Sequence, residues 1–594
     1  MSTSPIPERL AGSRILVTGV TGFLGQAVLE RLLAHVTEAR PTLLVRGQGG
    51  LSGRDRVESL LAGPAFNMLR DRVGAPALRT MLDERVEVIE ADVAEGPPAL
   101  PSDLDVVFHC AASVSFDPPI DQGFRTNVVG AANLYEAIRG SSPHVVHVST
   151  AYVAGVARGI VAEEPLGHEV DWRVERDAAV DARRMVEAAS RRPEMLDAFL
   201  RRARREHSRA GPQTVADDAE RRRRTWVDRR LVEYGRARAQ TLGWPDVYTL
   251  TKALGERVAE EAARDGIPVS IVRPSIVESA LGHPYPGWIE GFKMAEPIIL
   301  AYGRGNIPEF PGIPEGIVDL IPVDLVVNAM LAIAATRPEP EPRYYHVCSG
   351  SRNPLRYREL FEHVRSYFRA HPLAQRARGE IRVPDWRFPG RTHVERMMRA
   401  GERALDAADR VVGRLPRSSR VRGWVRRLDR ERGRLDFVRK YADLYGAYTE
   451  AEVIYTDERT VDLWESLLPQ DQERFPFDAA AIEWRHYIEE VHCPAVTRTL
   501  RFERPARSEP KVQVRPRQNG VLAVFDLEGT VVASNVVESF LWVRLADLEP
   551  DRWPAAIASL ARSMPRYLAA ERRDRGAFLR AFYRRYEGAS FDSL

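Results

Sequence analysis

Residues 14–25 read RILVTGVTGFLG. A short, mostly apolar run, typical of a buried strand, ends at Thr18, and Gly19, Gly22 and Gly25 follow it directly. An apolar helical pattern then continues to Leu33. Small residues at such a turn let the backbone approach a phosphate closely, and the helix N-terminus offers free N–H groups to it. Glycine triplets also occur in ordinary tight turns, but the strand before and the helix after this one favour a dinucleotide-binding α/β unit.

Further strand-like segments follow at intervals, and helical stretches separate them. They span residues 42–45, 86–89, 106–109, 145–148, 269–272 and 345–347. Alternating strands and helices predict a parallel sheet with helices on both faces. The expected fold class is therefore α/β: a Rossmann-type doubly wound parallel sheet with a helical insertion, a mainly helical C-terminal domain and a partial second α/β domain.

Composition changes along the chain suggest the domain limits. We expect a nucleotide-binding α/β domain over residues 1–370, with an insertion rich in Arg, Glu and Ala at about 156–243. A charged helical domain is expected over residues 371–500. Residues 501–520 carry Pro and charge with little apolar content and indicate a linker. A new strand-like segment then opens residues 521–594.

Bulk properties exclude several classes of protein. The 594 residues carry a formal net charge of +3, and no basic tail or face points to nucleic acid. Three distant cysteines without metal-ligand spacing fit a reduced, cytoplasmic compartment and predict neither a disulfide framework nor a metal site. Neither a secretory signal nor an apolar run of membrane-spanning length is visible. Peripheral membrane contact and the oligomeric state stay open.

The end of the second strand bears on the choice of cofactor. An NAD site usually has an acid there to bind the ribose hydroxyls, whereas this strand ends at Val45 and is followed by Arg46. An arginine can pair with a 2′-phosphate, although in a chain so rich in arginine it can equally be a solvated surface residue. We therefore expect NADPH as the cofactor. Asp92 is placed to meet the adenine ring, and the small Ala111 and Ala112 leave room for the cofactor to pass.

Tyr248 and Lys252 have the spacing of a helical i, i+4 pair, which places both side chains on one face. A lysine bound to the cofactor lowers the pKa of a nearby tyrosine, so that the phenol can exchange protons with a substrate. Such pairs are common by chance. The hydroxyls of Ser149 and Thr150 end another strand, where ligands bind in sheets of this kind. Asn127 is expected to support the cofactor side, and the order of these groups along the chain favours a reductase site.

That order resembles the extended short-chain dehydrogenase/reductases. Several stretches resemble more narrowly the fatty acyl-CoA reductases: YTLTKALGE, SIVRPSIVESALGHPYPGWIEGF, VDLIPVDLVVNAML and YHVCSGSRNPL. The resemblance is strong over about residues 12–360 and weaker to about residue 500.

The resemblance implies roles for individual residues. Thr150, preferred over Ser149 by its register with the family, and Tyr248 would hold the substrate carbonyl, while Lys252 would hold the nicotinamide ribose and tune Tyr248. The full expected cofactor site comprises Thr18, Gly19, Thr21, Gly22, Phe23, Leu24, Gly25, Arg46, Asp92, Val93, Ala111, Ala112, Asn127, Tyr248, Lys252, Pro274, Ser275 and Ile276.

The resemblance also implies the reaction, which is reduction of a long-chain acyl-CoA by NADPH to an aldehyde and on to a primary alcohol. Residues 280–299 suggest an acyl tunnel, with ordinary core as the alternative, and arginines of the insertion are candidates for the CoA phosphates. Other readings stay open: a nucleotide-sugar or sterol dehydrogenase, an acyl carrier protein thioester as substrate, or a cofactor-binding regulator. An intact Tyr248–Lys252 pair disfavours the regulator.

The last segment carries a second resemblance. Asp526, Glu528 and Gly529 stand in FDLEGT, which is similar to the first motif of haloacid-dehalogenase-type phosphatases, with Glu528 where that family has aspartate. The later motifs of that family do not appear before Leu594, so an incomplete domain or a degenerate tail is expected rather than a phosphatase.

Overall fold

The computed structural model describes residues 4–207, 211–291, 295–305, 312–375, 379–385 and 453–502, with single positions between 388 and 563. The chain divides into two compact units. The first comprises residues 1–186 and 228–509, and the second comprises residues 187–227 and 510–594. The expected linker over residues 501–520 and the phosphatase-like segment over residues 521–594 lie almost wholly outside the described residues.

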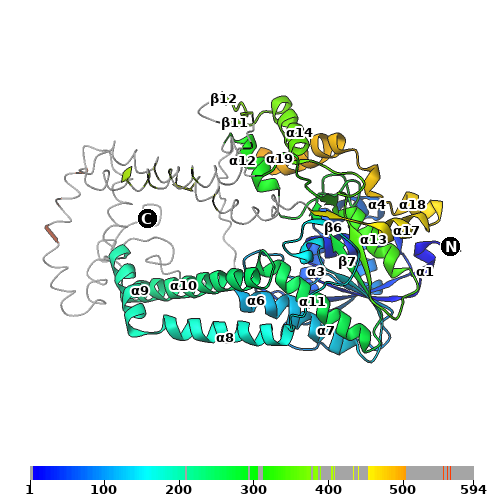
Figure 1. Cartoon of the computed structure of the whole chain (residues 1–594), viewed down its shortest axis with the longest axis horizontal. Coiled ribbons are helices and arrows are strands. Elements are labelled where there is room, and N and C mark those ends of the chain that lie inside the picture. Colours follow the sequence, from blue (N-terminus) through cyan, green and yellow to red (C-terminus); the bar gives the residue numbers. More distant parts are fainter. Residues whose placement is uncertain are drawn as a thin grey trace, which may run out of the picture. The chain divides into compact units, whose positions relative to one another are not determined.

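A seven-stranded parallel sheet forms the centre of the first unit (Figure 1). The strand order is β10-β7-β5-β4-β1-β2-β3. The strands are β1 (Arg14–Thr18), β2 (Arg40–Val45), β3 (Glu87–Glu90), β4 (Val106–His109), β5 (His144–Val148), β7 (Val269–Pro274) and β10 (Arg343–Val347). All seven strands predicted for the nucleotide-binding domain are present, so the doubly wound α/β prediction is confirmed. The order reverses between β1 and β4, and ligands bind at such a switch point, beyond the carboxyl ends of the strands.

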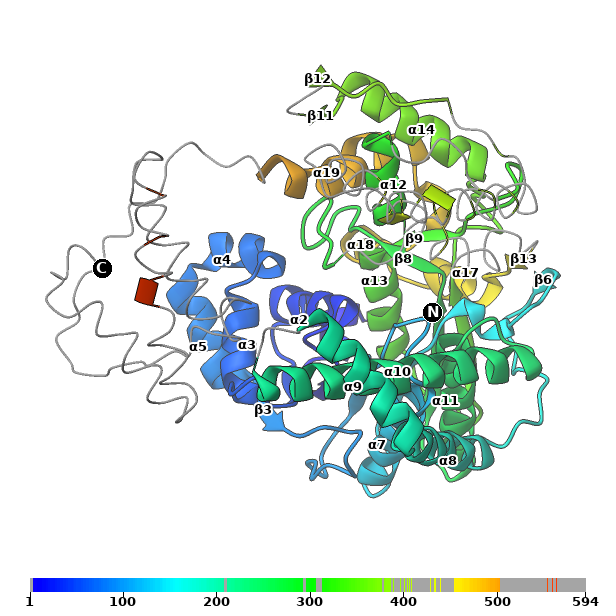
Figure 2. The ribbon, with the colours of Figure 1, turned by 90° about the vertical axis from the view of Figure 1, so that its left-hand side faces the viewer.

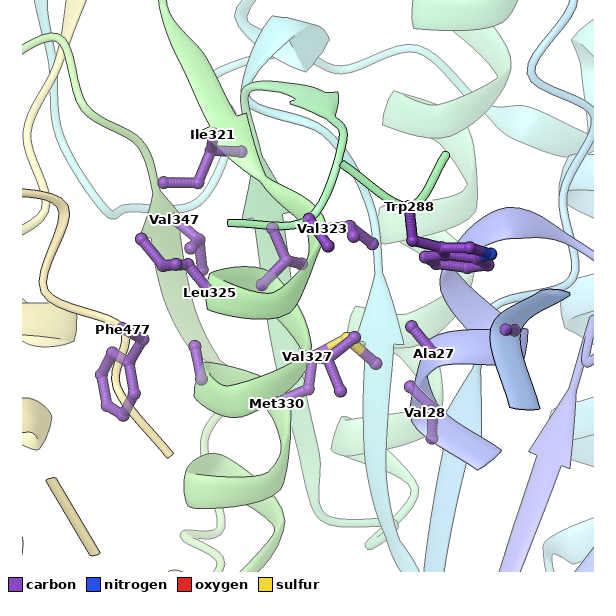
Figure 3. Close-up of a cluster of buried hydrophobic side chains, with 14 of the residues drawn as sticks. Ala27, Val28, Trp288, Ile321, Val323, Leu325, Val327, Met330, Val347 and Phe477 are labelled. Carbon is purple, nitrogen blue, oxygen red and sulfur yellow. The ribbon is translucent and has the colours of Figure 1, made fainter. Parts of the chain in front are cut away.

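Helices cover both faces of this sheet. On one face, helices α2 (Phe23–His35) and α13 (Val323–Ala334) contact each other. On the other face, four helices pack together: α6 (Ile120–Phe124), η2 (Arg125–Val129), α7 (Gly130–Ile138) and α11 (Val247–Arg264). Every residue of α13 is buried, which fits its almost wholly apolar sequence. In Figure 3, Val327 and Met330 of α13 lie toward Ala27 and Val28 of α2. This packing fixes the glycine turn and the start of α2 against the sheet.

Shorter elements surround the sheet. Before β1 lies α1 (Ile6–Arg9), and between β2 and β3 lie α3 (Gly53–Leu61), η1 (Pro64–Phe66), α4 (Asn67–Val73) and α5 (Ala75–Arg85). After β5 comes η3 (Ala151–Ala154), and after β7 come β8 (Ile276–Glu278), α12 (Glu296–Gly303) and β9 (Leu320–Pro322). After β10 come α14 (Tyr357–Ala370), β11 (Ala374–Gln375) and β12 (Gly379–Glu380). The parallel pair of β8 and β9 was not predicted from the sequence.

The stretch predicted as a helical insertion contains α8 (Trp172–Ser190), α9 (Pro193–Glu206) and α10 (Pro212–Thr241), as Figure 2 shows. In the first unit, α8 and α10 are joined by ion pairs of Glu175 with Arg238 and of Arg183 with Asp228. In the second unit, Arg223 pairs with Glu187 and Glu220. Several arginines of the insertion are therefore committed to carboxylates of the protein itself.

One part of this stretch is not helical. Strand β6 (Gly159–Val161) pairs in parallel with β13 (Val453–Tyr455). The reading of 156–243 as helical throughout was wrong here, because two β-branched residues follow a glycine and find a strand partner from a distant part of the chain. The described C-terminal part continues with α17 (Glu458–Glu465), α18 (Pro469–Arg474), η4 (Ala479–Ala481), η5 (His486–His492) and α19 (Cys493–Phe502).

Within the described residues, no helix combines the length and the apolar character needed to cross a bilayer. The three cysteines are free thiols, with Cys348 and Cys493 buried.

Candidate active site

A cavity of about 260 Å³ opens at the carboxyl edge of the sheet, beside the switch point. Its lining contains most of the predicted catalytic and cofactor residues, although they come from distant parts of the sequence. From the predicted set it includes Gly19, Gly22, Phe23, Leu24, Gly25, Ala112, Ser149, Thr150, Tyr248, Lys252, Pro274, Ser275 and Ile276. The cavity is the candidate active site.

The glycine turn is closed so tightly that side chains do not fit in it. Gly19 has a φ of +69°, and a Cβ there would lie 2.6 Å from the backbone nitrogen of Ala111. A Cβ on Gly25 would lie 2.3 Å from the carbonyl oxygen of Gly19. The turn leads into α2, whose first amides carry no side-chain cap. Free N–H groups and close backbone access suit a pyrophosphate group, so these residues fit a dinucleotide.

Lys252 lies on α11 with its side chain buried against the end of β5. Its Nζ donates a hydrogen bond to the carbonyl oxygen of Val148. Burial lowers the pKa of Lys252 to about 8, and the nearby carboxylate of Glu256 partly offsets that effect. The ammonium is therefore the main form at neutral pH, and it loses its proton as the pH rises through about 8.

Tyr248 stands one turn earlier on the same helix and faces the same cavity. Burial raises the pKa of its phenol above the usual range, while a hydrogen bond with Thr150 acts in the opposite direction. Phe116 packs edge-on against the ring, with the two centroids 5.7 Å apart. The phenol thus keeps its proton at neutral pH and is positioned as a hydrogen-bond donor.

Thr150 and Ser149 differ in their surroundings, although both line the cavity. The hydroxyl of Thr150 donates to the carbonyl oxygen of Pro274 at 3.4 Å and accepts from the backbone N–H of Tyr152 at 3.4 Å. The Oγ of Ser149 is buried and has no hydrogen-bond partner among the described residues. Thr150 is the hydroxyl that forms a hydrogen bond with Tyr248. The hydroxyl of Ser149 is a second one that a ligand can reach.

Two predicted cofactor residues are fully engaged with the protein. Asn127 donates to the carbonyl oxygen of Ser113 at 3.1 Å and to Oγ1 of Thr251 at 2.9 Å, so it ties the loop after β4 to α11. The hydroxyl of Thr18 lies 2.9 Å from Nδ1 of His109 and accepts from the N–H of Ala111 at 3.2 Å. These two residues connect the loop after β4 with β1 and α11, and so support the site. Their contact with a cofactor stays a prediction.

Arg46 and Asp92 lie outside the cavity lining and contact each other, with Nη1 of Arg46 3.5 Å from Oδ2 of Asp92. Val93, next to Asp92, is buried, and its carbonyl oxygen accepts a hydrogen bond from the side chain of Asn133. Arg46 is well exposed.

Sequence reasoning missed a second arginine in this place. Arg56 of α3 donates to the carbonyl oxygen of Arg46 at 2.6 Å and to Oγ1 of Thr21 at 3.4 Å, the latter in the glycine turn. Arg56 comes near Arg46 only when the chain folds. Because the chain is rich in arginine, nothing in the sequence distinguished Arg56 from the other arginines.

Other cavity residues follow β7 and were also missed as site residues. Val277, Ile289, Glu290, Gly291 and Glu296 line the cavity. Trp288 is buried and packs against Phe23, with ring centroids 4.9 Å apart. The segment predicted as an acyl tunnel therefore contributes both to the cavity and to the core, and its role as a tunnel stays a prediction.

The fold and the cavity define a Rossmann-type nucleotide-binding domain with a Tyr/Lys pair and a strand-end hydroxyl. The model of the male sterility protein NAD-binding domain matches residues 17–330, and a second model of the same description matches residues 421–501. The chain belongs to the male sterility protein family.

Relatives within this family are called fatty acyl-CoA reductases. "Fatty acyl-CoA reductase 2, chloroplastic" of Arabidopsis thaliana is 28% identical over 518 residues, covering 82% of this chain and 78% of its own. The "Alcohol-forming fatty acyl-CoA reductase" of Simmondsia chinensis is 28% identical over 83% of this chain and 98% of its own. Among solved structures, the terminal R domain of the myxalamid pathway aligns with 83% of this chain and 91% of its own, at 17% identity and a TM-score of 0.49. The resemblance to fatty acyl-CoA reductases expected from the motifs is confirmed.

Proposed function

We propose that the protein reduces long-chain fatty acyl-CoA with NADPH, first to the aldehyde and then to the primary alcohol. The observation that carries the proposal is the meeting of Tyr248, Thr150 and Lys252 in one cavity beside the glycine turn. The names of the relatives support the substrate class, and the printed name of the Simmondsia relative supports an alcohol as the end product.

The residues present fit a dinucleotide. Gly19, Gly22 and Gly25 would hold the pyrophosphate at the start of α2, and Lys252 would hold the nicotinamide ribose. Arg46 and Arg56 would pair with the 2′-phosphate, which favours NADPH over NADH. NADPH, when bound, supplies the hydride for each reduction.

The side chains of the cavity would stabilise the charge that develops on the substrate. Tyr248 and Thr150 would donate hydrogen bonds to the carbonyl oxygen as it becomes an oxyanion, and preorganised donors in a dry site stabilise such a charge strongly. Lys252, as an ammonium, would lower the pKa of Tyr248 when the phenol gives up its proton. The raised pKa of Tyr248 in the present structure keeps the phenol in the donating form.

Two turnovers of the same site would complete the reaction. In the first, hydride would add to the thioester carbon, the tetrahedral adduct would collapse, and the C–S bond would break to give an aldehyde and a thiolate that takes a proton from water. In the second, hydride adds to the aldehyde carbon, and Tyr248 gives its proton to the oxygen to form the alcohol.

The test is NADPH consumption with a long-chain acyl-CoA, with the lipid product identified by gas chromatography. Alcohol formed at two NADPH per acyl chain supports the proposal in full, and aldehyde at one NADPH limits it to the first reduction. Parallel assays with acyl carrier protein thioesters, UDP-sugars and sterols distinguish the other substrates. Turnover of one of these, with none for acyl-CoA, would overturn the proposal.

A further inference from the structure

An aromatic side chain lies beside the ring of Tyr248. The loop between β4 and α6, residues 110–119, contributes Val114 and Phe116 to the cavity lining. The rings of Phe116 and Tyr248 meet edge-on, with their centroids 5.7 Å apart and their planes at 77°. The reaction outlined above gives Phe116 no role, although Phe116 borders the residue that would bind the substrate carbonyl.

The first part of this loop is held by Asn127. The backbone N–H of Ser113 donates to Oδ1 of Asn127 at 2.7 Å, and the side-chain amide of Asn127 donates to the carbonyl oxygen of Ser113 at 3.1 Å. Asn127 also donates to Thr251 of α11, the helix that carries Tyr248. One side chain thus connects the loop to the helix of Tyr248.

The last part of the loop is held by the helical insertion. Arg236 of α10 pairs with Asp117 through Nε, which lies 3.3 Å from Oδ1, and through Nη2, which contacts Oδ2. Arg183 of α8 pairs with Asp121 through Nε at 2.9 Å and through Nη2 at 3.1 Å. Such two-point pairs fix direction as well as distance. Two helices of the insertion therefore hold the chain directly after Phe116, within the first unit.

The position of Phe116 limits the space next to the substrate carbonyl. A carbonyl oxygen bound to the phenol of Tyr248 would bring the adjoining carbons of the acyl chain close to Phe116, because both rings line one cavity. Val114 and Phe116 are apolar, which suits methylene groups better than the polar amides of the CoA thiol. A methyl branch on the carbon next to the carbonyl would need extra room against a loop that is held at both ends, and overpacking of this kind is unfavourable.

We propose that Phe116 selects acyl thioesters that are unbranched at the carbon next to the carbonyl, and that Arg236 positions it by holding Asp117. Arg183 holds the same chain segment from α8. The inference rests on the proposed function, because it defines which acyl thioesters that site accepts. It also gives the helical insertion a role, which is to keep the loop and its aromatic ring in place.

The test compares kcat/KM for hexadecanoyl-CoA with that for its 2-methyl-branched analogue. Wild-type protein is expected to prefer the unbranched thioester about 100-fold, within the range that one methyl group produces in an apolar pocket. In Phe116→Ala the preference should fall to about tenfold or less, because the branch finds room, and Phe116→Leu should lie between. A merely structural Phe116 would lower kcat/KM for both thioesters alike and leave their ratio unchanged. Turnover of the unbranched thioester reports whether each variant has folded.

The insertion is tested from both sides of its ion pair. Arg236→Met keeps a long side chain without the charge, and Asp117→Asn changes the partner. Each is expected to lower the preference about threefold, in line with the modest strength of a partly exposed ion pair. The double variant should match the single ones, because all three lose the same pair. Arg229 on the same helix pairs with Glu233 instead, so Arg229→Met is the matched control and should keep the wild-type preference.

Three results would overturn the inference. A wild-type protein that reduces both thioesters equally well exerts no such selection. A preference in Phe116→Ala within about twofold of the wild-type value shows that Phe116 does not exert it. Unchanged preference in both Arg236→Met and Asp117→Asn would remove the positioning role of the insertion. Failure of the proposed function is distinct from all three, because then the wild-type protein reduces neither thioester.

Discussion

The two walls of the cavity are built in different ways. One wall is made by the carboxyl ends of β1, β4 and β5 and by α11, and its polar groups, Lys252, Tyr248 and Thr150, are held by hydrogen bonds to the protein. The other wall is made by β8, the chain that follows it and the start of α12. Its apolar residues include Ile276, Val277 and Ile289, and Glu290 and Glu296 also line it.

This difference separates two tasks. The first wall has polar side chains held by hydrogen bonds to the protein and tightly closed glycines, as expected where a cofactor of fixed shape must be held to within a fraction of an ångström. The second wall offers mainly apolar surface, which suits an acyl chain. Substitutions in the first wall should therefore impair every reaction of the site, whereas those in the second should distinguish between substrates.

The largest effect is expected for Tyr248→Phe. The loss of the phenol proton should lower kcat/KM about 10³-fold for acyl-CoA and for aldehyde alike, because both use the first wall. NADPH affinity, measured by fluorescence titration, should stay within about twofold. Tyr234→Phe on α10 makes the same chemical change at a partly exposed site and should keep full activity. An active Tyr248→Phe protein would show that the proton donor lies elsewhere.

Gly25→Ala should weaken NADPH binding about 100-fold, or about 2.7 kcal/mol. Its new Cβ would approach the Gly19 carbonyl oxygen to 2.3 Å, and the backbone would have to move out of the phosphate-binding position. Isothermal titration calorimetry gives the affinity, and thermal unfolding shows whether the fold persists. Gly140→Ala is the matched control, because no atom lies within 4 Å of its added Cβ. Equal NADPH affinity in both variants would contradict the assigned phosphate site.

The pH profile tests Lys252. Burial lowers the pKa of this group to about 8, so it is charged below that pH and loses its proton as the pH rises through it. We expect kcat/KM to be level from about pH 6 to 7 and to fall roughly tenfold per unit well above pH 8. Lys252→Arg, whose guanidinium keeps its charge, should be slower but level over the same range. A wild-type profile that stays level to pH 10 would argue against a role for the ammonium.

A smaller effect is expected for Arg46 and Arg56, which lie outside the cavity lining. Arg46→Ala should lower the preference for NADPH over NADH about tenfold, because one charge-assisted hydrogen bond to the 2′-phosphate is lost. Arg56→Ala should act in the same direction. Arg54→Ala on α3, where Arg54 pairs with Glu58 and Asp83, removes a comparable charge and should leave the preference unchanged. The ratio of kcat/KM values for the two cofactors is the measurement.

The strands and the first wall could be predicted because their signals are local. β1, β4 and β5 are buried apolar runs, and the spacing of Tyr248 and Lys252 follows from one helix. The second wall could not be predicted, since β8 has only three residues and becomes a strand by pairing with β9. Strand β6 was missed for the same reason, and Phe116 comes to lie beside Tyr248 only through tertiary packing.

The most direct test of the account follows the hydride itself. NADPH deuterated at the transferred position is incubated with a long-chain acyl-CoA, and the lipid product is analysed by mass spectrometry. The account predicts deuterium on the former carbonyl carbon, one atom in the aldehyde or two in the alcohol, with none above background in Tyr248→Phe over the same time. A wild-type lipid product without deuterium, or acyl-CoA left unchanged while bound NADPH is intact, would contradict it.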